Sequence, residues 1–173
     1  DLVDWGNNFV QDYPTNGIDP SYQTQFKIVY DDNNLYVGIR MFDDEPEKIG
    51  KRLSRRDVND GDWVSIAFDS YNDNLTAYSF GVNAVGVKKD LIFVNDNHHG
   101  DQSWDAVYFA KVSIDDKGWV AEFKIPLSQL RFSDIESHHW GLQITRKIFR
   151  FNEISTWKII PKDVKGFVSN WGN

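Results

Sequence analysis

The feature that most constrains this fold is an alternation of apolar and other side chains that recurs along the chain. It is clearest over residues 24–42, where every second residue from Leu35 to Met41 is apolar. An Asp/Asn cluster at residues 31–34 precedes this run, and such side chains favour turns because they bond their own backbone. Period-two alternation places apolar side chains on one face of a strand. Residues 24–42 are therefore predicted to form a β-hairpin.

The same alternation predicts the rest of the fold. Further strands are expected over residues 63–69, 77–86, 87–94, 104–114, 118–126 and 140–151, with a shorter one near 155–160. Short helical turns are expected at residues 45–51 and after Pro126. Strands repeating at intervals of about ten residues indicate an all-β fold, an antiparallel β-sandwich (jelly-roll or immunoglobulin-like) of about 8–11 strands. We expect one domain over residues 1–173, as a fragment of a longer protein.

Composition excludes several classes of function. The chain has a net charge of -7 and a pI of about 5.0, which argues against a nucleic-acid partner. It contains no cysteine, so disulfides and thiolate chemistry are excluded. The sequence has no apolar run of the roughly 18 residues that a membrane helix needs. It also lacks nucleophile-elbow, phosphate-loop and HExxH motifs, so we expect no catalytic activity.

Two neighbouring predicted strands carry small side chains on one face. These are Ser65 and Ala67 on the first strand and every second residue over 77–83 on the next, opposite bulky apolar faces. One interpretation is an outer surface in contact with water. The other is a concave face that receives a ligand or a neighbouring domain, with Trp63, Trp104 and Tyr108 at its rim.

Aromatic residues are abundant, with 7 Trp, 7 Tyr and 12 Phe making 15% of the chain. Indole and phenol rings stack on the C–H faces of sugars, while polar side chains bind the hydroxyl groups. The candidate stacking residues are Trp63, Trp104 and Tyr108. The candidate polar partners are Asn83 and Arg56.

Acidic residues crowd the loop before Trp63. Asp57, Asp60 and Asp62 are the oxygen donors that Ca²⁺ prefers, although their spacing is not that of an EF-hand. Similar acidic turns lie at residues 43–45 and 69–73, so the loop that holds calcium stays open, and a plain solvated turn is the alternative. Glu122 lies inside a predicted strand; as a lone acid it does not make a glycosidase pair.

Several stretches, taken in order, resemble the family-9 carbohydrate-binding module superfamily. Within residues 24–150 they are YDDNNLYVGIRMFDDEP, GDWVSIAFDSYND, AYSFGVNAVG, SWDAVYFAKV, GWVAEFKIPLSQLRF and HHWGLQITRKI. More narrowly, RRD…GDW, WDAVY, IPLSQLRF, WGLQITR and the terminal GFVSNWG are similar to the N-terminal module of a family of large bacterial outer-membrane proteins.

This resemblance implies a jelly-roll-like sandwich, a structural calcium ion and a sugar site in which two aromatic rings clamp a pyranose. The chain departs from the family at the positions that contact sugar hydroxyls, where it has Ser65, Gly81 and Thr145. Neither clamp tryptophan has a match, because the corresponding loops are residues 55–60 and 165–167. The resemblance therefore implies the family's fold, but the residues of the family's sugar site are not retained in this chain.

The resemblance also implies a function. We expect a non-catalytic carbohydrate-binding module of an exported or outer-membrane bacterial protein, placed in the periplasm, at the outer membrane or outside the cell. Its partners would be an oligo- or polysaccharide and a C-terminal β-barrel-type domain of the same chain. The alternative is a structural or docking domain that packs against the rest of an outer-membrane protein and has no sugar affinity. A glycoside hydrolase using Glu122 is the second rival.

Overall fold

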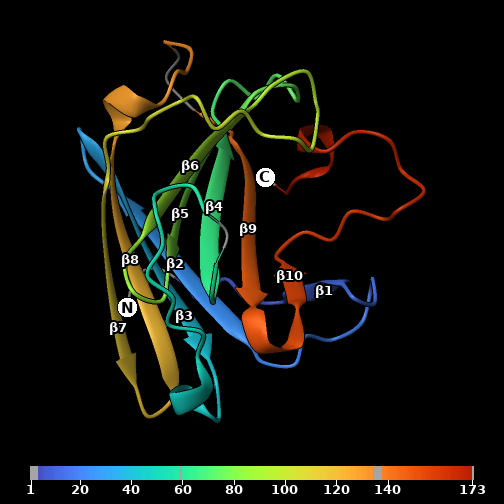
Figure 1. Cartoon of the computed structure of the whole chain (residues 1–173). Helices are drawn as coiled ribbons and strands as arrows, with labels where there is room; N and C mark the ends of the chain where they lie inside the picture. The colour runs from blue at the N-terminus through green and yellow to red at the C-terminus, as the bar shows by residue number, and fades with distance from the viewer. Residues whose placement is uncertain (1–3, 59, 135–137, 173) are drawn as a thin grey trace.

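The computed structural model describes residues 4–58, 60–134 and 138–172, which form two antiparallel sheets packed face to face (Figure 1). The larger sheet has the order β1-β10-β9-β4-β5-β6 and the smaller the order β2-β3-β8-β7. The strands are β1 (Val10–Tyr13), β2 (Thr24–Tyr30), β3 (Asn34–Phe42), β4 (Trp63–Asp69), β5 (Ala77–Asn83), β6 (Lys88–Phe93), β7 (Phe109–Asp115), β8 (Gly118–Pro126), β9 (Gly141–Ile148) and β10 (Glu153–Thr156). The predicted antiparallel β-sandwich is confirmed.

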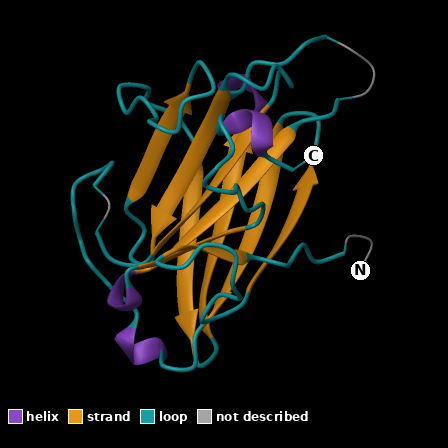
Figure 2. Cartoon of the chain, turned by 90° about the vertical axis from the view of Figure 1, so that its right-hand side faces the viewer, coloured by secondary structure: helices purple, strands orange, loops and turns teal. Residues whose placement is uncertain are grey.

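Helical structure in the described part of the chain is limited to short 3-10 turns, which lie toward the ends of the sandwich (Figure 2). They are η1 (Pro46–Lys48), η2 (Leu127–Gln129), η3 (Phe149–Phe151) and η4 (Val168–Asn170). The first two lie where helical turns were predicted. No helix among these residues is long and apolar enough to cross a membrane.

The predicted hairpin is β2 and β3, paired from Thr24 opposite Met41 to Tyr30 opposite Leu35. At its turn the Asp31 carboxylate accepts hydrogen bonds from the backbone N–H groups of the two following asparagines, at 2.8 and 2.7 Å. Side-chain bonding to the local backbone is the reason that Asp initiates turns of this kind.

The core lies between the two sheets. Val64, Ile66 and Phe80 project from β4 and β5 and are fully buried, as are Ile39 and Trp119 from the smaller sheet. Burying an apolar side chain of this size stabilises the folded state by about 1.5–3 kcal/mol. These inner faces therefore supply most of the driving force for folding. The small side chains of β4 and β5 consequently point out of the sandwich.

The strand predicted over residues 104–114 begins only at Phe109. The backbone N–H groups of Ala106 and Val107 donate to the side chains of Asp90 and Gln129 instead of to a neighbouring strand. The segment therefore enters the sandwich as a loop, in which Ala106 and Tyr108 are buried while Val107 is exposed.

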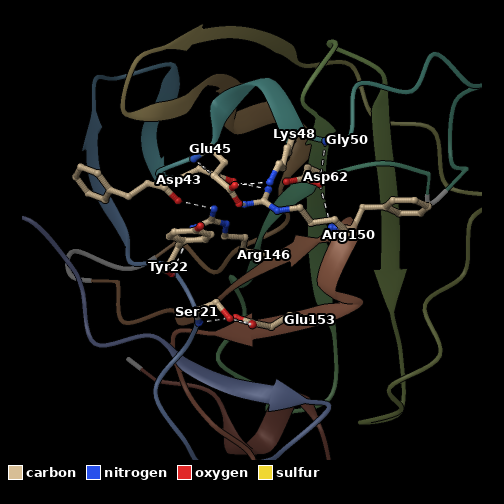
Figure 3. A network of polar contacts seen from close by, with 12 residues as sticks. Ser21, Tyr22, Asp43, Glu45, Lys48, Gly50, Asp62, Arg146, Arg150 and Glu153 are labelled. Atoms are coloured by element: carbon tan, nitrogen blue, oxygen red, sulfur yellow. Dashed lines mark hydrogen bonds and ion pairs between the residues drawn. The ribbon is translucent and has the colours of Figure 1, made fainter.

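A network of buried polar contacts joins the loops at one end of the sandwich (Figure 3). Arg150 donates two hydrogen bonds of 2.8 Å to the buried carboxylate of Asp43. Arg146, which is fully buried, donates to the carbonyl of Phe42 at 2.7 Å. Burial alone would raise the pKa of Asp43, but the bonds from Arg150 outweigh it and hold that pKa below its ordinary value. The network therefore holds η3 against the end of β3.

Replacing Asp43 with Ala should lower the free energy of unfolding by about 3 kcal/mol, because it leaves a largely buried guanidinium without its partner. Urea unfolding measures the loss. The control is Asp115→Ala, which breaks the exposed pair with Arg40 and should cost much less. Equal losses in the two variants would contradict a stabilising role for the buried network.

Candidate ligand-binding groove

The outer face of the six-stranded sheet is hollowed into a groove of about 1080 Å³. Its floor includes the small side chains of Ser65, Ala67, Ser79 and Thr145, and Trp63 is part of its lining. These residues are cross-strand neighbours on β4, β5 and β9, all pointing away from the core. The concave interpretation of the small-residue face is the one that the structure supports.

One wall of the groove is the C-terminal segment after β10, which loops out to the right of β9 in Figure 1 and returns toward the sheet near its end. The amide side chain of Gln143 donates to the backbone carbonyl of Lys158 at 2.7 Å and accepts from the N–H of the same residue at 3.0 Å. The Gln143 side chain thus satisfies both backbone polar groups of Lys158, as a neighbouring strand would. Because both ends of its amide are engaged, it is committed to the wall.

The loop after β6 forms the opposite wall and is bonded to the C-terminal segment. The Asp96 carboxylate accepts hydrogen bonds from the backbone N–H groups of Phe167 and Ser169 and from the Ser169 hydroxyl, at 2.7, 3.0 and 2.7 Å. These bonds outweigh the effect of burial, and the pKa of Asp96 is below its ordinary value. Gly166 permits this approach, since a Cβ there would lie 2.4 Å from an Asp96 carboxylate oxygen.

A second, smaller core closes one end of the same face. Trp171 and Val168 of the C-terminal segment pack with Phe93 against Ala67 and Ala77 of the sheet. The Phe93 and Trp171 rings meet edge to face at 5.9 Å between centroids. Small side chains on β4 and β5 therefore make room for the chain's own C-terminal aromatics as well as for the groove.

Trp63 meets a positive charge at the floor of the groove. The Lys89 ammonium lies 5.2 Å from the centroid of the Trp63 ring, within range of a cation–π contact. Burial lowers the pKa of Lys89 to about 8. The opposite charge of Asp57 favours the protonated form, and the like charge of Lys147 disfavours it.

Trp63 is the one predicted stacking residue that lines the groove. Trp104 packs between the rings of Tyr78 and Phe80 on the core side of the sheet. Tyr108 is 1% exposed, and its hydroxyl donates to the Gly81 carbonyl at 2.7 Å. A stacking role does not fit either ring, because both lie on the inner side of the sheet.

The two predicted polar partners are held by the protein itself. The Asn83 side chain is buried, donates to the Arg52 carbonyl and accepts N–H bonds from Val85 and Val87. Arg56 donates to the buried carboxylate of Asp90. Both residues lie outside the groove lining, where their contacts organise loops rather than a ligand.

The predicted calcium donors do not come together as a ligand set. Within residues 4–58, 60–134 and 138–172, no three acidic, His or Cys side chains are arranged to hold a metal ion. Asp57 accepts from the N–H of Asp90, and Asp60 from that of Gly61. Asp62 is fully buried and accepts N–H bonds from both Gly50 and Phe149, while burial raises its pKa. These three carboxylates do not fit a calcium site.

Tyr108→Phe should lower the free energy of unfolding by about 1 kcal/mol, since it removes a buried hydrogen bond to a backbone carbonyl. Thermal or urea unfolding gives the value. Tyr36→Phe is the matched control, because its hydroxyl donates to the exposed Asp31 carboxylate and the change should cost less. A larger loss at Tyr36 would contradict the structural role assigned to Tyr108.

Several solved structures of other proteins have a similar architecture. Two structures of a family 9 carbohydrate-binding module from Caldicellulosiruptor kristjanssonii, in complex with glucose and with cellotriose, are similar with a TM-score of 0.68 and 18% identity. Each match covers 98% of this chain and 82% or 80% of the other. A protein from Bacteroides uniformis matches with a TM-score of 0.68 and 14% identity, over 96% of this chain and 85% of the other.

Among curated protein sequences, none matches this chain. The family model described as carbohydrate family 9 binding domain-like matches residues 7–149, which cover β1 to β9 and the floor of the groove up to Thr145. The chain therefore belongs to the carbohydrate family 9 binding domain-like family.

Proposed function

We propose that this domain is a non-catalytic carbohydrate-binding module that holds a saccharide in the groove on the outer face of the six-stranded sheet. The observation that carries the proposal is the groove itself, which lies over small side chains and has an aromatic ring in its lining. Concave sites that combine an aromatic surface with a few polar groups are typical of small-ligand binding. Trp63 is the stacking surface in this proposal.

Two of the similar structures support a saccharide as the ligand class, since they hold glucose and cellotriose. This chain differs from the family at the positions that contact the sugar. The positions where the family resemblance places sugar-contacting polar side chains carry Ser65 and Thr145, which leave space above the sheet. The C-terminal segment and the loop after β6 then supply the walls.

A binding role without catalysis agrees with the positions of the acidic groups. Glu122, the residue considered for a hydrolase, is exposed on β8 of the four-stranded sheet, opposite Lys111 of β7. Two carboxylates among the described residues line the groove: Asp96 is bonded to the C-terminal segment, and Asp12 accepts from the amide of Asn16 at 2.9 Å. A hydrolase would need a pair of carboxylates flanking the scissile bond.

Several finer features stay predictions. They are an exported, periplasmic or outer-membrane location and a C-terminal β-barrel-type partner domain. The resemblance to the N-terminal modules of large outer-membrane proteins supports them.

Trp63→Ala should weaken saccharide binding about tenfold or more, because it removes the aromatic surface on which the sugar ring would stack. Calorimetry with gluco-, xylo- and manno-oligosaccharides at millimolar concentration measures the change. Trp5→Ala is the control, since Trp5 is 47% exposed and lies outside the groove lining. Wild-type protein that binds none of these sugars, nor any acidic sugar, would favour the docking alternative.

A further inference from the structure

The edge strands of the two sheets differ in how they are covered. An edge strand presents a row of unpaired backbone N–H and C=O groups, which folded proteins usually cover or protect. The edges at β1, β2 and β6 are each covered by another segment of the chain. The covering bridges are Gln11 with Ile18, Phe26 with Gly6, and Ile92 with Asp101. Strand β7, which ends the four-stranded sheet on the left side in Figure 1, has no bridge of this kind within residues 4–58, 60–134 and 138–172.

The register with β8 determines which backbone groups of β7 face the open side. Asp115 pairs with Gly118 across a two-residue turn, so these two residues exchange backbone hydrogen bonds. Every second residue before Asp115 bonds to β8 in the same way, because the ladder alternates. The backbone N–H and C=O groups of Val112 and Ile114 therefore point away from the sheet, where a further strand can pair with them.

Apolar side chains at this edge are incompletely covered. Val112 and Ile114 lie opposite Ala121 and Trp119 of β8, which are fully buried, so both project toward the core. Ile114 is nevertheless 38% exposed, and Val112 is only partly buried. A strand added beside β7 would cover both side chains, and burial of apolar surface favours association.

The charges on the outer face of β7 select a second copy of the same strand. Lys111, Ser113 and Asp115 alternate along this face and are exposed. When β7 of two copies lies antiparallel and centred on Ser113, Lys111 of each copy lies opposite Asp115 of the other. Opposite charges in such cross-strand pairs stabilise a sheet, and like charges destabilise it. Centring the pair on Lys111 or on Asp115 would place like charges opposite one another.

The same register also satisfies the other groups at this edge. It places Val112 opposite Ile114, the two residues whose backbone groups face the open side. The Asp115 carboxylate already accepts from the Arg40 guanidinium at 2.8 Å, which holds the pKa of Asp115 below its ordinary value. A carboxylate has about four acceptor positions, so a Lys111 ammonium from the second copy can be added.

We propose that two copies of this domain pair through β7, antiparallel and centred on Ser113, so that their four-stranded sheets form one continuous sheet. The seven residues of β7 make a small interface compared with the roughly 20–30 residues a side of a standard one. The dimer is therefore in equilibrium with the monomer.

The pairing has a consequence for the groove. Cross-strand neighbours project from the same face of a sheet. The outer faces of the two four-stranded sheets therefore continue on one side of the dimer, and both grooves open on the other side. The pairing does not depend on the proposed function. If the groove binds a saccharide, the dimer presents two sites to one polymer, which strengthens binding without any new contact.

Sedimentation velocity tests the interface. Between about 10 μM and about 1 mM the chain should pass from monomer to dimer. Lys111→Glu should raise the dissociation constant about tenfold, because like charges then face one another at both symmetric positions. The matched control is Lys165→Glu, which makes the same charge change at an exposed residue of the C-terminal segment and should leave the dissociation constant unchanged.

A single cysteine tests the register. The chain has no cysteine, so an introduced thiol is unique. Ser113 of one copy would face Ser113 of the other with Cα atoms about 4.5 Å apart, within the range of about 4.4–6.8 Å that a disulfide spans. With oxidised glutathione, Ser113→Cys should form linked dimers about tenfold faster than Ser133→Cys, which places a thiol on an exposed loop residue.

A backbone variant separates pairing from folding. Ile114→Pro removes an N–H group that faces the open side and leaves the hydrogen bonds to β8 in place, and edge strands tolerate proline. It should abolish the dimer, while circular dichroism and urea unfolding report a folded monomer.

The outcomes decide the proposal independently of saccharide binding. A chain that stays monomeric at about 1 mM, with Ser113→Cys linked no faster than Ser133→Cys, would overturn it. A dimer that survives both Lys111→Glu and Ile114→Pro would overturn it as well, since another surface must then hold the copies. Neither result changes the calorimetry that tests the groove.

Discussion

Close approach of β4 and β5 is the contact on which both faces of the larger sheet depend. The strands pair Ser65 with Gly81, and a Cβ on Gly81 would lie 3.3 Å from both the Ser65 side chain and the carbonyl of Val64. Their inner faces carry bulky residues such as Ile66 and Phe80, which drive the sandwich together. One alternating pattern therefore produces a dense core on one side and an open floor on the other.

The groove acquires depth from segments that are distant in the sequence. Gln143 and Asp96 bind the backbone of the C-terminal segment with side-chain hydrogen bonds, at Lys158 and at Phe167 and Ser169. These bonds satisfy backbone groups that no strand partner reaches. The geometry of the binding site is thus set by a few polar side chains, while the stability of the sandwich comes from the buried apolar faces.

The sequence was sufficient to predict the fold and only part of the site. The hairpin of β2 and β3 and the small-residue face followed from alternation, which reports which face a side chain occupies. The strand predicted over residues 104–108 is absent, because that backbone bonds to the side chains of Asp90 and Gln129, and Tyr108 lies in the core. Lys89 was missed as a groove residue, since its role depends on which strand lies beside which.

Gly172 pairs with Leu142 as an isolated bridge, and residues between it and Lys158 cross the open sheet with little regular backbone pairing. A segment held in this way can detach at a lower free energy than the strands beneath it. A ligand that touches both floor and wall would favour the docked arrangement, and docking would in turn strengthen ligand binding by the same factor. Occupancy of the groove by such a ligand would therefore be thermodynamically linked to docking of residues 158–172.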